Sequence, residues 1–175
     1  VAVSAYVVHC LHALHLHPEL REQLSQRSAD DFQCFVQEVR RYYPFFPFVA
    51  AKVKKSFEWK GYPFPAGRKV LLDLYGTNHD ARIWDRPDDF NPERFRKWEG
   101  NPFTLILQGG GDHYLNHRCP GEWIAIEQMK VAVDVFVNRC EYDVPEQALG
   151  IEMDRLPAIP RSHFILQNVR VEKRA

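Results

Sequence analysis

One cysteine, Cys119, stands in a setting that favours a thiolate. Three consecutive glycines at residues 109–111 precede it, and they let the backbone turn tightly and pass close to a flat or bulky group. Pro120 and Gly121 follow, and then an amphipathic run that extends to about Arg139. Because proline is favoured in the first turn of a helix, Cys119 is predicted to lie just before a helix N-terminus. The free N–H groups and the positive end of the helix dipole there stabilise the thiolate over the thiol.

A stabilised cysteine thiolate can act as a nucleophile, as a zinc ligand or as the axial ligand of a haem. A zinc site could combine Cys119 with Asp112, His113 and His117, although ligands so close in sequence would form a cramped cage. A cysteine hydrolase would need a histidine base, and none of the eight histidines is distinguished. The three glycines lack the flanking residues of a phosphate-binding loop.

Two further motifs narrow this choice. Glu38 and Arg41 form an E-x-x-R pattern on a predicted helix, where residues three apart can meet on one face. A Pro-Glu-Arg-Phe segment that contains Arg94 follows, within a stretch rich in proline, aspartate and asparagine. Without other motifs, Glu38 and Arg41 would be interpreted as a weak ion pair on the surface of the helix. Taken with the Cys-Pro-Gly loop, in this order and spacing, the three motifs form a specific signal.

The order of these motifs resembles the C-terminal half of a cytochrome P450. In that family E-x-x-R lies on one helix, Pro-Glu-Arg-Phe lies in an irregular meander, and the cysteine loop carries the proximal haem ligand. The resemblance covers nearly all 175 residues. It implies an α+β, mainly α fold in which helices and small β-sheets support the cysteine haem-ligand loop.

The same resemblance implies that residues 1–175 are the C-terminal part of a single cytochrome P450 haem domain, a fragment whose distal half is missing. We therefore expect the isolated chain to retain haem poorly, because much of the apolar porphyrin would be exposed to water.

The cysteine loop departs from the common pattern of the family. The phenylalanine usually found seven residues before the cysteine is replaced by Asp112, and the glycine four residues before it by Leu115. Together with the Leu-Tyr-Gly-Thr-Asn-His-Asp segment at residues 74–80, this longer loop resembles the fatty-acid peroxygenase branch. That resemblance implies an oxidoreductase that hydroxylates or decarboxylates long-chain fatty acids with hydrogen peroxide, without a redox partner. The Arg-Pro pair that binds the fatty-acid carboxylate in this branch is expected upstream of Val1. The alternatives are a reductase-dependent cytochrome P450 monooxygenase and a non-enzymatic haem- or zinc-binding domain.

The resemblance also assigns roles to individual residues. Cys119 would be the axial ligand of the iron in haem b, and its negative charge would push electron density toward the iron. Backbone N–H groups near Gly121 would hydrogen-bond the sulfur. His117 takes the place of an arginine that often binds a haem propionate, a task that Arg118 or Lys52 could share. The residues expected along the porphyrin edge are Gln108, Gly109 and Gly110.

Two further groups of residues are singled out by the resemblance. Glu38, Arg41 and Arg94 are expected to form a buried structural triad, because a fork-shaped guanidinium suits bidentate clamping of a carboxylate. Phe45 and Phe48 lie on a turn stiffened by prolines and are candidate walls of the fatty-acid channel, with plain core packing as the other interpretation.

Composition limits the classes of partner. Lys plus Arg and Asp plus Glu both number 23, so the chain has no net charge, which argues against a nucleic-acid partner. Aromatic residues make up 13% of the chain and suit a pocket for a large apolar ligand. No C-x-x-C motif, signal peptide or long apolar run occurs, so a cytoplasmic location is predicted. The other three cysteines, interpreted as small buried residues, are Cys10, Cys34 and Cys140.

Hydrophobic periodicity predicts helices over residues 1–16, 18–26 and about 30–43, and a longer one after Cys119. Strands are predicted within residues 49–75, with a hairpin turn at Lys60 and Gly61, and again at residues 141–144 and 163–171. A short helical turn is expected at residues 78–81. In the first helix, His9, His12 and His15 have a spacing that could bind a metal, but a partly exposed polar stripe is the preferred interpretation.

Overall fold

The computed structural model describes residues 2–26 and 28–171. Its helices are α1 (Ala2–Leu16), α2 (Pro18–Ser25), α3 (Ala29–Tyr42), α4 (Leu74–Asn78) and α5 (Glu122–Asn138), with a 3₁₀ turn η1 (Pro92–Phe95). Its strands are β1 (Phe48–Lys52), β2 (Phe57–Trp59), β3 (Tyr62–Phe64), β4 (Lys69–Asp73), β5 (Cys140–Asp143) and β6 (Gln167–Val171). The predicted class, α+β and mainly α, is therefore confirmed.

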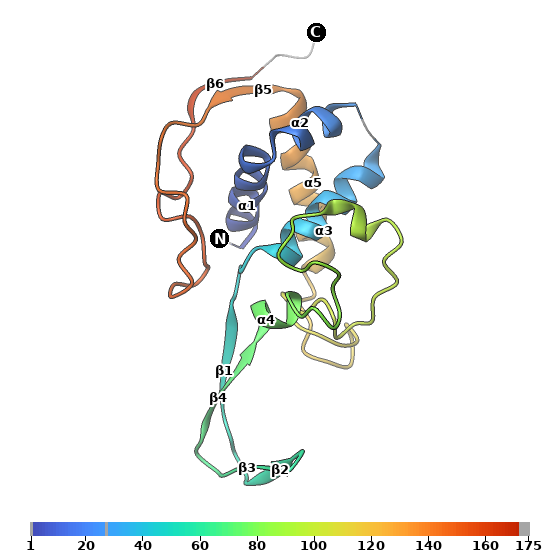
Figure 1. Cartoon of the computed structure of the whole chain (residues 1–175), viewed down its shortest axis with the longest axis vertical. Coiled ribbons are helices and arrows are strands. Elements are labelled where there is room, and N and C mark those ends of the chain that lie inside the picture. Colours follow the sequence, from blue (N-terminus) through green and yellow to red (C-terminus); the bar gives the residue numbers. More distant parts are fainter. Residues whose placement is uncertain (1, 27, 172–175) are drawn as a thin grey trace.

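The core lies where α1, α3 and α5 pack against one another (Figure 1). Helix α3 is central to it, and its start is fixed by a capping box in which the Ser28 N–H donates to Asp31 Oδ2 at 3.0 Å. Its end is fixed by Pro44, which disfavours helical geometry at Tyr43. The inward stripe of this helix includes Val36 and is fully buried, so α3 holds its polar side chains at defined positions in the interior.

Three two-stranded antiparallel sheets extend from this helical core. Strands β1 and β4 pair over their whole length and form a ribbon that projects away from the helices, with the β2–β3 hairpin near its far end (Figure 1). Strands β5 and β6 pair on the other side of the molecule, next to the end of α5. The predicted hairpin at Lys60 and Gly61 is confirmed, since both residues have the positive φ that a tight hairpin turn requires.

The first helix buries histidines that were expected to be partly exposed. His9 and His12 are 0% and 5% exposed, so the interpretation as a partly exposed stripe is wrong for these two residues. His9 Nε2 lies 2.8 Å from the carbonyl oxygen of Ala158, and His12 Nδ1 lies 2.8 Å from the Tyr43 hydroxyl. Each imidazole therefore satisfies at least one ring nitrogen inside the core, which periodicity alone does not reveal.

The ends of other elements differ slightly from expectation. The short helix α4 spans residues 74–78 rather than the predicted 78–81, because the Asp73 side chain caps its start by accepting from the Gly76 N–H at 2.7 Å. Cys10, Cys34 and Cys140 are buried free thiols, as predicted.

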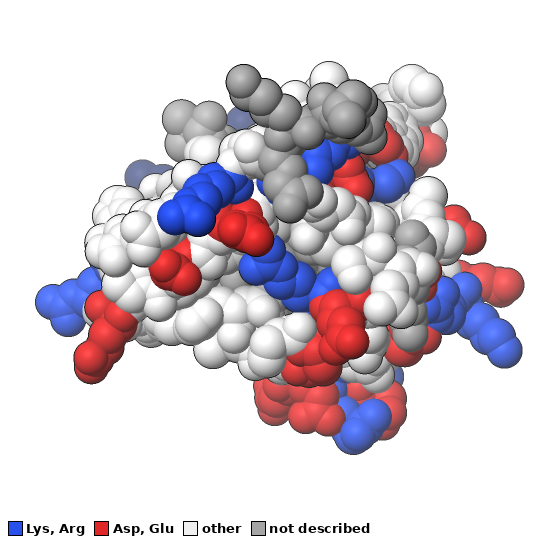
Figure 2. Space-filling view, turned by 90° about the horizontal axis from the view of Figure 1, so that it is seen from above, with Lys and Arg blue, Asp and Glu red and all other residues white. Residues whose placement is uncertain are grey.

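Charged groups of both signs are interspersed with uncharged side chains over the face seen in Figure 2. Among residues 2–26 and 28–171, the helices are too short or too polar to span a bilayer.

Candidate haem-ligand site

The cysteine loop presents one exposed thiol directly in front of a helix. Cys119 lies two residues before Gly121, the N-cap of α5, and it is the one exposed residue among the four free cysteines. The Cys119 N–H donates to the Gln108 carbonyl at 2.8 Å, which ties the cysteine to the start of the loop. The Glu122 N–H donates back to the Cys119 carbonyl at 3.2 Å. As predicted, α5 begins just after Cys119 and is the longest helix in the described residues.

The backbone around the first glycine is too tight for any side chain. Gly109 has a φ of 97°, and a Cβ placed there would lie 2.1 Å from the carbonyl oxygen of His117. Gly109 also pairs with Arg118 in an isolated antiparallel bridge. The glycine run therefore lets the two arms of the loop cross in contact, which fixes the approach of the chain to Cys119.

A buried carboxylate joins the loop to the helical core. The Glu122 side chain is 5% exposed and accepts from Arg118, whose Nε lies 2.6 Å from Oε2 and whose Nη2 lies 3.1 Å from Oε1. His113 Nε2 lies 3.1 Å from Oε2, and Arg40 of α3 donates to Oε1. Arg40 Nη2 also donates to Gln108 Oε1 at 2.8 Å. We call these five residues, 40, 108, 113, 118 and 122, the Glu122 cluster.

The cluster controls the protonation of its carboxylate. Burial alone would raise the pKa of Glu122, but the hydrogen bonds and charges of Arg118 and Arg40 outweigh it and lower this pKa to about 2. Sequence reasoning missed both Glu122 and Arg40. The i, i+4 spacing of Arg118 and Glu122 is a usable signal for one pair. Nothing local links Arg40 to a residue 82 positions away.

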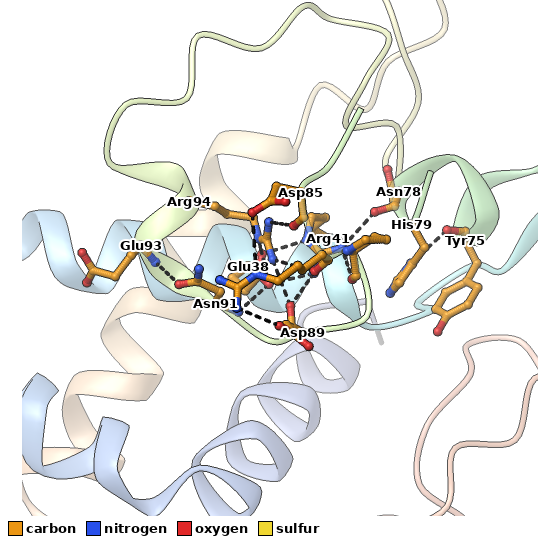
Figure 3. Close-up of polar contacts among 12 residues, drawn as sticks. Glu38, Arg41, Tyr75, Asn78, His79, Asp85, Asp89, Asn91, Glu93 and Arg94 are labelled. Carbon is orange, nitrogen blue, oxygen red and sulfur yellow. Dashed lines mark hydrogen bonds and ion pairs between the residues drawn. The ribbon is translucent and has the colours of Figure 1, made fainter. Parts of the chain in front are cut away.

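A second buried ion-pair cluster, which we call the Glu38 cluster, joins Glu38, Arg41 and Arg94 (Figure 3). Glu38 and Arg41 are both 0% exposed, and the guanidinium grips the carboxylate through Nε–Oε2 and Nη2–Oε1 contacts of 2.8 and 2.7 Å. Arg94 Nε donates to Glu38 Oε1 at 3.2 Å, so the three side chains meet as the motifs predicted. The Asn91 N–H donates to the same oxygen at 2.8 Å.

The two arginines of this second cluster also bind the irregular segment before η1. Arg41 donates to the carbonyls of Pro87 and Asp89 in this segment, and also to that of Asn78 at the end of α4. Arg94 donates to the carbonyls of Asp85, Arg86 and Asp89. These bonds order a stretch that has little regular secondary structure, so one buried carboxylate anchors residues 85–94 to α3.

The other predicted site residues lie as follows. His117 and Lys52 are exposed, whereas the Arg118 guanidinium is engaged by Glu122 and by the Gly111 carbonyl at 3.3 Å. Phe45 is 4% exposed and stacks on Tyr6 at a centroid distance of 4.3 Å, so it packs in the core. Phe48 is 36% exposed at the start of β1. The two phenylalanines therefore lie in different surroundings.

The donor set around Cys119 fits a haem better than zinc. Within residues 2–26 and 28–171, no three His, Cys, Asp or Glu side chains are arranged to hold a metal ion, so neither Cys119 with His113 and His117 nor the histidines of α1 form a closed zinc site. A haem iron takes a single protein sulfur on its proximal side. An exposed cysteine on a tight loop before a helix supplies such a ligand.

Comparison with known proteins agrees with this chemistry. The family model of cytochrome P450 matches residues 32–166. The chain therefore belongs to the cytochrome P450 family, whose cofactor is haem. Cytochrome P450 71D180 of Thymus vulgaris is 29% identical over 78% of the chain, and cytochrome P450 1A1 of Homo sapiens is 28% identical over 89%. The chain spans 29% and 31% of the lengths of these two proteins.

Solved structures narrow the resemblance. Cytochrome P450SP alpha in complex with (R)-ibuprofen is 53% identical, with a TM-score of 0.88 over 97% of this chain and 42% of that one. Cytochrome P450EX alpha with myristic acid is 45% identical, with a TM-score of 0.85 over 98% and 41%. A variant of cytochrome P450 OleT in complex with arachidonic acid is 44% identical, with a TM-score of 0.84 over 99% and 41%. The resemblance to the fatty-acid peroxygenase branch is thereby confirmed.

Proposed function

We propose that residues 1–175 are the C-terminal part of one haem domain, and that the complete enzyme oxidises long-chain fatty acids with hydrogen peroxide. The observation that carries this proposal is the identity of 44–53% over nearly the whole chain to structures of three proteins, two of which contain a fatty acid. The exposed Cys119 thiol at the start of α5 supports it, because that position suits a haem-thiolate ligand.

In this proposal the chain supplies the proximal half of the site. When bound, haem supplies the oxidising chemistry, with peroxide as the source of the oxygen atom. Cys119 would hold the iron through its sulfur, and the negative charge of that sulfur would favour O–O cleavage. The backbone of Gly109 and Gly110, together with Gln108, would pass along the porphyrin edge, and the exposed His117 is the candidate for binding a propionate. Backbone N–H groups near Gly121 are the candidate donors to the sulfur.

The substrate carboxylate has a role of its own in the proposal. A fatty acid held by a cation outside this chain would place its carboxylate beside the oxidant, where it can serve as the general acid–base for peroxide cleavage. Turnover would then depend on a carboxylic acid. Of the two phenylalanines, Phe48 is the accessible candidate from this chain for contact with the alkyl tail, because Phe45 packs in the core against Tyr6.

The first test is spectroscopic and concerns the ligand. The complete protein, reduced and bound to carbon monoxide, should give the strongly red-shifted Soret band of a thiolate-ligated haem, and Cys119→Ser should lose it. Cys34→Ser, which removes a buried thiol elsewhere, should keep the band. A Cys119→Ser protein with an unchanged Soret band would refute the ligand assignment.

The second test concerns the oxidant and the substrate. With hydrogen peroxide and no reductase, the complete enzyme should oxidise a long-chain fatty acid and leave an alkane of equal length almost untouched. Adding a short carboxylic acid should rescue turnover of the alkane. Activity that required a nicotinamide-driven electron supply and ignored the carboxylate would favour the reductase-dependent monooxygenase instead.

A further inference from the structure

The Glu122 cluster differs from the Glu38 cluster in its position relative to Cys119. Three of its members, His113, Arg118 and Glu122, flank the cysteine in sequence, and the backbone N–H of Glu122 donates to the Cys119 carbonyl. The side-chain oxygen of Gln108 accepts a hydrogen bond from Arg40, and its backbone carbonyl accepts one from the Cys119 N–H. Both backbone hydrogen bonds of Cys119 are therefore made with residues whose side chains belong to the cluster.

The cluster also contains more positive than negative charge. Two guanidinium groups, those of Arg40 and Arg118, share the carboxylate of Glu122. Both ends of the Arg40–Glu122 pair are at most 5% exposed, so solvent screens their charges only weakly.

We propose that Glu122 is a positioning residue that sets the electron-donating strength of the Cys119 thiolate by offsetting the positive charge of Arg40 and Arg118. This inference rests on the proposed ligation of haem by Cys119. Groups that surround the ligands of a metal without contacting the metal tune its reduction potential through hydrogen bonds and charge. In a buried cluster such charges act at a low effective dielectric.

The sign of each substitution follows from Coulomb's law. Reduction of the bound iron adds one negative charge. Removing the nearby carboxylate makes that addition easier, so Glu122→Gln raises the reduction potential. Removing a nearby cation makes it harder, so Arg118→Gln lowers the potential. A role limited to holding the loop in shape predicts no such opposition, because both substitutions break the same pair of side chains.

The experiment measures the reduction potential of the complete haem-loaded protein and its Glu122→Gln, Arg118→Gln and Arg118→Lys variants. We expect the reduction equilibrium to change by about tenfold, equivalent to about 59 mV, upward for Glu122→Gln and downward for Arg118→Gln. Arg118→Lys keeps the charge while losing the bidentate grip, and it should stay close to the wild type. The matched control is Glu127→Gln on the same helix, an exposed partner of Lys130, which should leave the potential unchanged.

Several outcomes would overturn the inference. Shifts of the same sign in Glu122→Gln and Arg118→Gln, or no shift in either, would show that the cluster does not act through charge. A shift in Arg118→Lys as large as that in Arg118→Gln would have the same meaning. If Glu122→Gln fails to bind haem, the reduction potentials of Arg118→Gln and Arg118→Lys still test whether charge at this partly exposed position matters. A wild-type protein without the thiolate-type Soret band would instead refute the proposed function.

Discussion

Arg40 and Arg41 are consecutive residues of α3, yet their guanidinium groups serve two separate buried ion-pair clusters. Arg41 clamps Glu38 and the carbonyls of the segment before η1, while Arg40 clamps Glu122 and Gln108 beside the cysteine loop. Both are at most 1% exposed. One turn of α3 therefore binds both the irregular segment before η1 and the cysteine loop.

Loss of Arg41 should prevent stable folding of the complete enzyme. Arg41→Ala leaves the Glu38 carboxylate buried with fewer donors, and breaking a buried pair in this way costs about 3–5 kcal/mol. Because that is a large part of a typical folding free energy, we expect little haem-loaded protein and a much lower urea midpoint. Arg82→Ala, which removes an exposed partner of Asp80, is the control and should leave the midpoint unchanged. A wild-type midpoint in Arg41→Ala would contradict the structural role of the Glu38 cluster.

Sequence reasoning succeeded where chemistry and spacing are local. The E-x-x-R pair lies within one helical turn, and Pro120 lies directly before Gly121, the N-cap of α5, so both could be placed to within a few residues without a structure. The meeting of Arg94 with Glu38 spans 56 residues and came only from resemblance to a family. The contact of Arg40 with Glu122 is longer still and has no motif attached to it.

The buried histidines were misjudged for a related physical reason. An imidazole in a helix is polar by type, and its burial depends on whether a carbonyl or hydroxyl from a distant segment meets it. For His9 that partner is Ala158, which no periodicity within α1 can indicate.

The tight crossing at Gly109 should be sensitive to a single methyl group. Gly109→Ala places a Cβ against the His117 carbonyl and also requires a residue with a φ of 97°, so the loop must open. We expect a loss of haem content and of the red-shifted Soret band in the complete protein. Gly150→Ala is the matched control, because a Cβ there meets no atom within 4 Å. Full haem content in Gly109→Ala would show that this crossing is not needed.

Burial of His9 should make stability depend on mild acidity. Burial lowers the pKa of His9 from 6.5 to about 4, so the folded state binds fewer protons than the unfolded state between these values. Stability from this residue is complete above pH of about 6.5 and falls toward pH 4, by at most about 1.4 kcal/mol per pH unit. Urea unfolding at several pH values should show that the free energy of unfolding depends less steeply on pH in His9→Gln than in the wild type.

Two substitutions refine this measurement. Burial also lowers the pKa of His12, so part of this pH dependence should persist in His9→Gln and become smaller still in a variant that lacks both imidazoles. His15→Gln changes an exposed histidine of the same helix and should keep the wild-type slope. An unchanged slope in His9→Gln would mean that this imidazole accepts a proton in the folded state.

Arg94 should depend on its shape as much as on its charge. Its guanidinium donates to Glu38 and to the carbonyls of Asp85, Arg86 and Asp89, and lysine cannot reproduce this planar set of donors. Since hydrogen bonds to charged groups contribute about 1.5–3 kcal/mol, we expect Arg94→Lys to destabilise the complete protein by about that amount. The loss should appear as a lower urea midpoint and as faster proteolysis within residues 85–96.

The same substitution at Arg86 separates shape from charge in this segment. The Arg86 side chain is 67% exposed and pairs with Asp85 and Asp89 at 3.6 and 3.4 Å, so lysine can replace it with little loss. Arg86→Lys should therefore match the wild type in both measurements. If Arg94→Lys also matched the wild type, a positive charge alone would hold the segment to α3. The carbonyl contacts of the Arg94 guanidinium would then be incidental to stability.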